Sequence, residues 1–176
     1  HRLLFRENPR EYLMCGGEGI HVTFDDGRTW RQVMSREDRI GYPDAMHVDP
    51  RNDSVVYVFG PRTGPGLWTK AGTSNPTVMR SRDFGETWQE LRGGLPADLV
   101  GNIEASALHR HGSDITLFFG TASGEVWQST DDGENWTRIA ADLPPIAKNG
   151  HFRYLLPPDE KLAAEEMMRA CGEEYA

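Results

Sequence analysis

The sequence predicts an all-β protein built from repeated four-stranded antiparallel sheets, and two observations support this fold class. First, one eight-residue pattern occurs three times: a Ser or Thr opens it, Asp follows two positions on, Gly two after that, and Trp three further. The copies end at Trp30, Trp88 and Trp136, so they are 58 and 48 residues apart, a period suited to about four short strands. Second, the segments between the copies are short alternating or β-branched runs separated by Gly, Pro, Asn and Asp.

The first repeat covers about residues 1–34. Its expected strands are short apolar or alternating runs at residues 3–5, 12–15, 19–24 and 29–33. Turn residues such as Asn8-Pro9 and Gly16-Gly17 separate them. Four short strands in this order predict an antiparallel meander, which is one blade of a β-propeller.

The second and third repeats cover about residues 44–92 and 103–140. Each contains a β-branched or aromatic run, at residues 54–59 and 115–120, that is typical of a buried central strand. The second repeat also carries an insertion, residues 60–76, rich in Gly and Pro. The blades together span residues 1–145, and a tail of residues 146–176 follows. Strong helix formers after Pro157-Pro158 predict a short helix over about residues 158–171.

The composition excludes several classes of protein. A net charge of −8 argues against a nucleic-acid partner, which needs clustered Lys and Arg. No apolar run approaches the ~18 residues of a transmembrane helix, so we expect a soluble protein without membrane contact. Cys15 and Cys171 form no ligand pattern and are interpreted as free thiols. The compartment stays open, with the cytoplasm favoured over secretion, and the chain reads as a piece of a longer or processed protein.

The repeated motif has a structural explanation. An Asp at a hairpin tip accepts hydrogen bonds from nearby backbone N–H groups, Gly takes the position that needs a positive φ, and Trp buries its ring beneath the turn. Nothing in this set requires solvent access or a shifted pKa, and each tip supplies too few ligands for calcium. We therefore expect neither a metal nor a cofactor. The structural residues are Asp25, Gly27, Trp30, Asp83, Gly85, Trp88, Asp131, Gly133 and Trp136.

The pattern Ser-x-Asp-x-Gly-x-Thr-Trp resembles the Asp-box, or BNR repeat, of sialidases and related β-propellers. The third repeat in particular resembles bacterial BNR-repeat proteins often labelled glycosyl hydrolases, and the chain is similar to the C-terminal half of such a propeller. The resemblance implies a ring of six to eight blades, of which three are visible here. The remaining blades would lie on another chain segment or on another copy. The arginine triad of the sialidase site is not carried over to any residue.

In a propeller the first strand of each blade lines the central channel, and ligands lie at the channel mouth. Asp44 and Glu104 occupy matching places at the starts of those strands in the second and third repeats, and Arg2 lies near the matching place in the first. Two carboxylates converging on one channel could perform acid–base catalysis on a glycoside. The alternative is a pair of solvated or mutually paired channel charges. In the insertion, Trp68 is expected to be exposed, and with Lys70 it could contact a sugar ring or a partner.

Two functions follow as hypotheses. The first is a propeller-type binding or assembly module with a carbohydrate or protein ligand at the channel mouth. The second is a glycoside hydrolase, or the C-terminal half of one, that acts through Asp44 and Glu104. Whether the chain is an enzyme is left open by the sequence.

Overall fold

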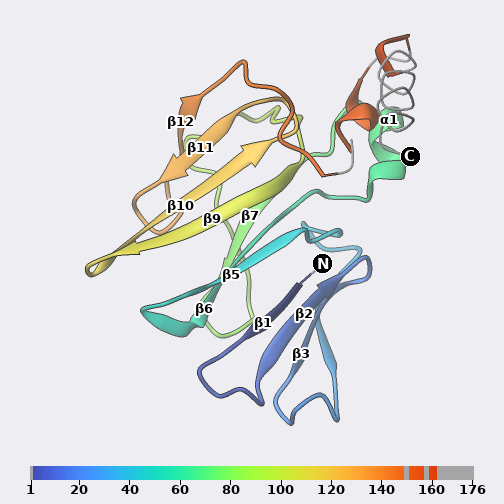
Figure 1. Cartoon of the computed structure of the whole chain (residues 1–176). Coiled ribbons are helices and arrows are strands. Elements are labelled where there is room, and N and C mark those ends of the chain that lie inside the picture. The colour runs from blue at the N-terminus through green and yellow to red at the C-terminus, as the bar shows by residue number, and fades with distance from the viewer. Residues whose placement is uncertain (1, 149–150, 157–158, 162–176) are drawn as a thin grey trace, which may run out of the picture.

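Three four-stranded antiparallel sheets, each a simple meander, make up most of the molecule in the computed structural model (Figure 1). The structure describes residues 2–148, 151–156 and 159–161. The first sheet contains β1 (Arg2–Phe5), β2 (Tyr12–Gly16), β3 (Gly19–Thr23) and β4 (Arg31–Ser35). The second contains β5 (Ala45–Asp49), β6 (Asn52–Gly60), β7 (Thr77–Ser81) and β8 (Gln89–Glu90). The third contains β9 (Ile103–His111), β10 (Asp114–Thr121), β11 (Val126–Ser129) and β12 (Thr137–Ala140).

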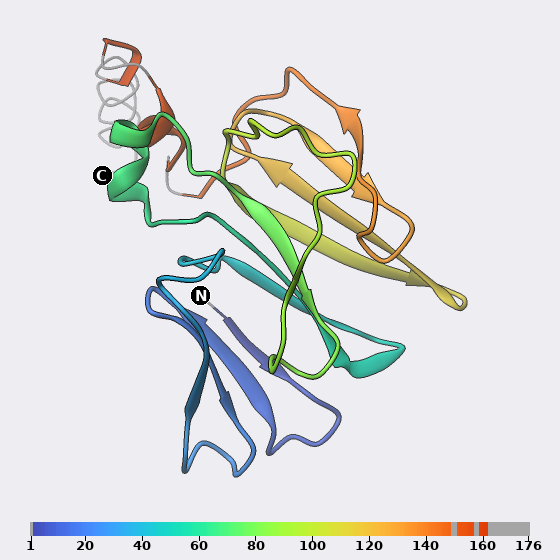
Figure 2. The same ribbon diagram turned by 180° about the vertical axis from the view of Figure 1, so that it is seen from behind.

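The first strands of the three sheets are neighbours in space, since β1 contacts β5 and β5 contacts β9. The view from behind in Figure 2 shows the same succession of sheets. The expected all-β class with four-stranded antiparallel sheets is therefore confirmed. Among the described residues, no helix is long and apolar enough to cross a membrane. Residues 159–161 are helical, and the rest of the helix expected at 158–171 lies outside the described residues.

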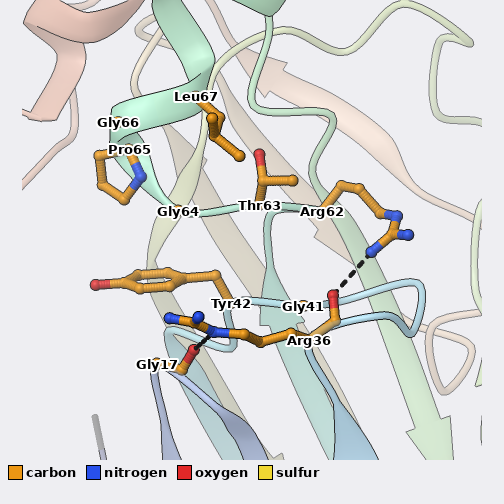
Figure 3. A pocket seen from close by; sticks show the side chains of 10 residues that line it. All are labelled: Gly17, Arg36, Gly41, Tyr42, Arg62, Thr63, Gly64, Pro65, Gly66 and Leu67. Atoms are coloured by element: carbon orange, nitrogen blue, oxygen red, sulfur yellow. Dashed lines mark hydrogen bonds between the residues drawn. The ribbon is translucent and has the colours of Figure 1, made fainter.

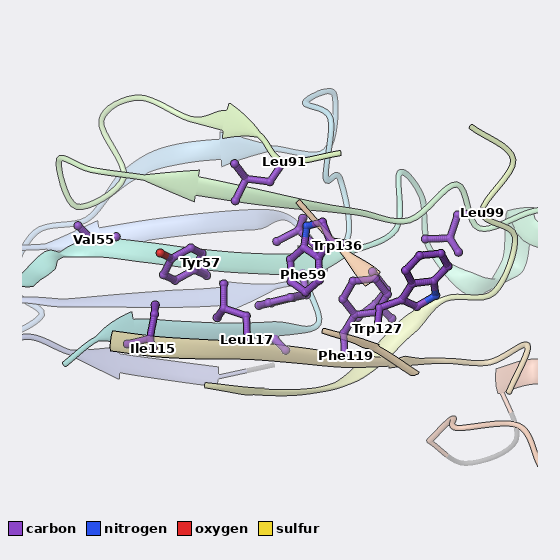
Figure 4. Packing of buried hydrophobic residues seen from close by; sticks show 13 residues of the cluster. Val55, Tyr57, Phe59, Leu91, Leu99, Ile115, Leu117, Phe119, Trp127 and Trp136 are labelled. Atoms are coloured by element: carbon purple, nitrogen blue, oxygen red, sulfur yellow. The ribbon is translucent and has the colours of Figure 1, made fainter. Parts of the chain in front are cut away.

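Two apolar clusters hold neighbouring sheets together. The cluster between the first and second sheets contains Leu13, Ile20, Val56 and Val58 among others. The cluster between the second and third sheets is richer in aromatic rings and is drawn in Figure 4; Phe59, Phe119, Trp127 and Trp136 lie at its centre. Ion pairs reinforce both interfaces: Arg6 with Asp53, 3.1 Å, and Arg80 with Glu134, 2.6 Å.

The three copies of the repeated motif form the same hydrogen-bonded turn. In the third copy, Ser129 Oγ accepts from the N–H of Gly133 at 3.0 Å and donates to Asp131 Oδ1 at 2.8 Å. The same Asp131 carboxylate accepts from the backbone and side-chain nitrogens of Asn135, each at 2.9 Å. Gly133 has φ of +86°, and a Cβ there would lie 2.6 Å from Leu91 Cδ1. The motif therefore closes the hairpin from within, and Gly is required at its tip.

The motif tryptophans differ in burial because each packs toward the preceding sheet. Trp136 is 3% exposed and lies against Phe59 of the second sheet. The Trp88 ring is partly buried, and its Nε1 donates to the Val33 carbonyl of the first sheet at 3.3 Å. Trp30 is 40% exposed, because no described sheet precedes the first. The expectation that every motif tryptophan is buried was therefore wrong for Trp30.

Strand register shows that the outer face of the first sheet is left open. Met14, Val58 and Phe119 occupy equivalent positions, each opposite the central residue of the strand leading into the motif. Val58 and Phe119 are fully buried against the preceding sheet, whereas Met14 is 39% exposed. Leu3 and Phe5 are also exposed on this face of the first sheet. The apolar pattern therefore continues onto a face that no described sheet covers.

Candidate functional site

Asp44 and Glu104, the two carboxylates singled out at the strand starts, meet in one buried cluster. Asp44 directly precedes β5 and Glu104 is the second residue of β9, and each is 4% exposed. The Asn102 side-chain nitrogen donates to Asp44 Oδ2 and to Glu104 Oε1, both at 3.0 Å. These two oxygens are therefore at most about 6 Å apart. This limit is compatible with the spacing between the two catalytic carboxyl groups of retaining glycosidases.

The same carboxylates also bind a segment from the far end of the chain. Lys148 Nζ lies 3.3 Å from Asp44 Oδ1, and the Lys148 backbone N–H donates to Glu104 Oε2. His151 Nδ1 contacts Glu104 Oε1. All four carboxylate oxygens of the pair are thus engaged by groups of this chain: Asn102, Lys148 and His151.

Burial dominates the electrostatics of the cluster. It raises the pKa of Asp44 above its ordinary value, while the hydrogen bond from Asn102 and the charge of Lys148 act in the opposite direction. Burial also raises the pKa of Tyr42, and the negative charges of Asp44 and Glu104 add to this effect. The Tyr42 side chain therefore lies within the field of the carboxylate pair, two residues before Asp44.

A pocket of about 360 Å³ lies beside the cluster, between the segment leading into β5 and the insertion after β6 (Figure 3). Its lining comes from both segments and from the turn after β2: Gly17, Arg36, Gly41, Tyr42, Arg62, Thr63, Gly64, Pro65, Gly66 and Leu67. Tyr42 thus connects the two features, because it lines the pocket and lies in the field of the carboxylates.

The insertion at residues 60–76 contains helical turns, although its Gly- and Pro-rich composition predicted an irregular loop. It forms a 3₁₀ turn, η1 (Pro65–Leu67), and one helical turn, α1 (Trp68–Ala71). Trp68 is 0% exposed: its Nε1 donates to the Thr63 carbonyl at 2.7 Å, and its ring lies edge-on to His151 in the 3₁₀ helix η2 (His151–Leu155). The expectation of an exposed Trp68 was therefore wrong, because α1 turns the indole inward.

The two remaining ligand-binding candidates, Lys70 and Arg2, make none of the contacts described for the carboxylate cluster. Lys70 is exposed on α1. Arg2 is exposed on β1, and its charge acts on the neighbouring inner-strand residue His47. Among the described residues, no group of three or more His, Cys, Asp or Glu side chains is placed to hold a metal ion.

Sequence reasoning found the carboxylate pair as a candidate but missed the residues around it. Asn102 had a usable signal, because it precedes Glu104 by two residues and so shares its side of the strand start. Lys148 and His151 had none, since they lie more than 40 residues from Glu104 and outside the repeats. Tyr42 was not singled out, although it lies two residues from Asp44.

The fold is that of β-propeller blades, and comparison with solved structures supports this class. The chain is similar to an ancestral GH74 enzyme (TM-score 0.60, 17% identity, 80% of this chain and 19% of that one). It is also similar to the GH74 enzyme of Niastella koreensis (TM-score 0.53, 21% identity, 79% and 22%). A third similar structure is YCF48 bound to a D1 peptide (TM-score 0.52, 15% identity, 81% and 40%).

The chain spans less than half the length of each of these proteins. At such identities the likeness concerns the fold alone. No protein-family model matches the sequence, and no curated protein matches it.

Proposed function

We propose that this chain supplies three blades of a propeller-type binding module, with its repeated motifs acting as structural Asp-boxes and its ligand bound at the channel mouth. One observation carries the proposal: all four oxygens of Asp44 and Glu104 are engaged by Asn102, Lys148 and His151. A general acid or a nucleophile needs an oxygen directed at the substrate. Here the carboxylates instead hold Asn102, Lys148 and His151 together at the starts of the inner strands. Their role is then to stabilise the channel mouth, and the ligand binds in the pocket beside them.

The alternative is a glycoside hydrolase, or part of one, that uses the same two carboxylates. The separation of at most about 6 Å between an Asp44 oxygen and a Glu104 oxygen favours it, as does the raised pKa of Asp44, which suits a general acid. The GH74 enzymes with a similar fold are compatible with either function. In the hydrolase, Lys148 and His151 would have to leave the carboxylates before a substrate could bind.

Turnover of chromogenic glycosides separates the two functions. We expect no release of nitrophenol from a panel of nitrophenyl α- and β-glycosides, because neither carboxylate has an oxygen available for catalysis. The assay uses the unaltered chain alongside Asp44→Asn and Glu104→Gln, which preserve the size of each side chain. Turnover by the unaltered chain that either substitution abolishes would replace the binding function with the hydrolase. Turnover that both variants retain would indicate a contaminating enzyme.

The apolar outer faces of the first and third sheets indicate that further blades complete the module. A propeller closes when the face of the first blade and the face of the last are both covered. Exposed Leu3, Phe5 and Met14 mark one such face, and Phe118 and Val126 line an apolar hollow on the other. We propose that further blades cover both, supplied by another chain segment or by a second copy.

The average mass of the 176-residue chain, measured by analytical ultracentrifugation, tests whether its outer faces bind a second copy. With its outer faces uncovered, the chain should self-associate, and its average mass should rise with concentration. Met14→Glu, placed on the open face of the first sheet, should reduce association. Ser113→Glu, an exposed position in the turn between β9 and β10 and outside both faces, is the matched control. A monodisperse monomer at all concentrations would contradict the proposal.

A further inference from the structure

The buried carboxylates at the channel mouth carry more negative charge than their contacts neutralise. Asp44 and Glu104 contribute two carboxylates, and Lys148 pairs with Asp44, its Nζ 3.3 Å from Oδ1. The contact of His151 with Glu104 adds a second positive charge only when the imidazole is protonated. Burial raises the pKa of Asp44 although Lys148 acts against this rise. With both carboxylates ionised and His151 neutral, one negative charge of the cluster is therefore left without a partner charge, which is costly for buried groups.

A buried acceptor without a donor lies in the same cluster. Asn102 is 0% exposed, and its amide nitrogen donates to both Asp44 and Glu104. The oxygen of the same amide, Asn102 Oδ1, is buried and accepts no hydrogen bond from the described residues. Burying an acceptor without a donor is unfavourable, so the cluster has a place for a further N–H donor from outside.

The side chain of Lys148 is held only weakly by Asp44. It is 43% exposed, whereas the Asp44 side chain is 4% exposed. The 3.3 Å between Lys148 Nζ and Asp44 Oδ1 is long for a charge-assisted hydrogen bond, which usually measures about 2.7–2.9 Å. The backbone N–H of Lys148 is bound separately, by Glu104. The Lys148 side chain can therefore turn into solvent while its backbone stays in place, and another cationic group can then contact Asp44.

The acceptors around Asp44 favour a primary ammonium group over a guanidinium group. An arginine side chain binds a carboxylate best through two parallel N–H···O bonds, which need both oxygens. Asp44 Oδ2 already accepts from Asn102, so only Oδ1, the oxygen that Lys148 contacts, can accept from a ligand. An ammonium group carries three N–H donors on one compact nitrogen. Such a group suits Asp44 Oδ1 together with Oδ1 of the neighbouring Asn102.

We propose that Asp44, Asn102 and Glu104 form a binding site for a primary alkylammonium group. The ligand nitrogen takes the place of the Lys148 side chain and donates to Asp44 Oδ1 and Asn102 Oδ1, while Glu104 adds negative charge. The group belongs to a lysine side chain of a protein partner or to a free diamine or polyamine. The inference rests on the proposed function, because it names the chemical group by which the ligand of the binding module is held. In the unliganded chain Lys148 is an internal substitute for that group.

NMR titrations that follow the side-chain amide signals of Asn102 test the site. The probes are cadaverine and the N-acetylated hexapeptide Gly-Ser-Gly-Lys-Gly-Ser, with arginine and norleucine forms of the peptide for comparison. In the Lys148→Met variant, which lacks the internal competitor, cadaverine and the lysine peptide should bind about fivefold or more tightly than in the unaltered chain. The norleucine peptide should not bind. The arginine peptide should bind about fivefold or more weakly than the lysine peptide.

Further variants locate the binding at Asp44. Asp44→Asn, combined with Lys148→Met, should weaken the lysine peptide about tenfold or more relative to Lys148→Met alone. Asp114→Asn, at an exposed carboxylate at the start of β10, is its matched control in the same background and should leave affinity unchanged. Lys70→Met is the matched control for Lys148→Met, because Lys70 is an exposed lysine on α1. It should bind the lysine peptide as the unaltered chain does.

Thermal unfolding gives a second measurement that does not depend on the NMR signals. Lys148→Met leaves the buried Asp44 carboxylate without its paired charge, so the Tm should fall. Cadaverine should restore part of this loss, because a ligand that binds the folded state stabilises it. The same concentration of cadaverine should leave the Tm of the variant carrying both Lys148→Met and Asp44→Asn unchanged.

The outcomes separate this inference from the proposed function. If neither cadaverine nor the lysine peptide binds the Lys148→Met variant, or if binding survives Asp44→Asn, the ammonium site is overturned and the binding module keeps another ligand. Equal affinity for the arginine and lysine peptides would overturn it as well. Tighter binding of the lysine peptide than of cadaverine supports a protein partner, and the reverse order supports a free amine. Asp44-dependent hydrolysis of a glycoside would overturn the proposed function instead.

Discussion

Replacing Trp136 with Ala should lower the free energy of unfolding by about 3–5 kcal/mol, the usual cost of removing a large buried aromatic side chain. Trp136 lies at the centre of the cluster between the second and third sheets, with its ring centroid 4.8 Å from that of Phe119 and 6.3 Å from that of Phe59. Its removal leaves a cavity at the interface rather than a gap at the surface. Urea denaturation followed by far-ultraviolet circular dichroism measures the loss.

The matched control is the same substitution in the first copy of the motif. Trp30→Ala should cost about 1 kcal/mol or less, because 40% of that side chain is already exposed and its ring contact is an edge-on approach to Tyr12. Trp136→Phe adds a second test. The Trp136 Nε1 is buried with no hydrogen-bond partner among the described residues, so Phe, a smaller aromatic ring, removes an unsatisfied N–H and should cost less stability than Ala. Equal losses for Trp136→Ala and Trp30→Ala would contradict packing toward the preceding sheet as the cause of the difference.

The sequence was sufficient for the architecture because the architecture is repeated. Each motif combines a hydroxyl, an Asp and a Gly that bond to one another, to the adjacent backbone and to the Thr or Asn side chain four residues after the Asp, so local chemistry specifies the hairpin. Strand alternation then determines which residues face a neighbouring sheet. The burial of the Trp30 side chain depends instead on whether another sheet precedes the first repeat, and no residue in the motif indicates this.

The candidate site was predictable only where it follows the repeat. Asp44 and Glu104 were found because equivalent strand starts converge in any succession of such sheets. Lys148 and His151 come from a segment with no periodicity, and their contacts depend on how the chain returns over the sheets. Trp68 was misjudged for a related reason: a Gly- and Pro-rich composition predicts a surface loop, yet one helical turn is enough to bury an indole.

Acidification should destabilise the protein through His47, by about 2–3 kcal/mol between pH 7 and pH 4. His47 lies on β5, where its Nε2 is 2.8 Å from Ser106 Oγ and its ring is edge-on to Phe59. Burial, and then the positive charge of Arg2, lowers the pKa of His47 from 6.5 to about 4. Between these values the unfolded chain binds a proton that the folded protein does not, so stability falls as the pH is lowered through this window. The magnitude follows from roughly 1.4 kcal/mol per pH unit, reduced because the ring is partly solvated.

Two variants and one titration isolate this contribution. His47→Gln can keep a hydrogen bond to Ser106 and should lose less stability than the unaltered protein between pH 6.5 and 4. Arg2→Gln removes the neighbouring charge and should raise the pKa of His47, so it should shrink the acid-dependent loss in part. Asp44 works in the opposite sense, because an acid whose pKa is raised on folding favours the folded state as the pH falls toward its ordinary value. The comparison of variants cancels that opposing contribution. NMR titration of the His47 ring reads the pKa directly, and a value above 6 would show that β5 does not bury this side chain as the structure describes.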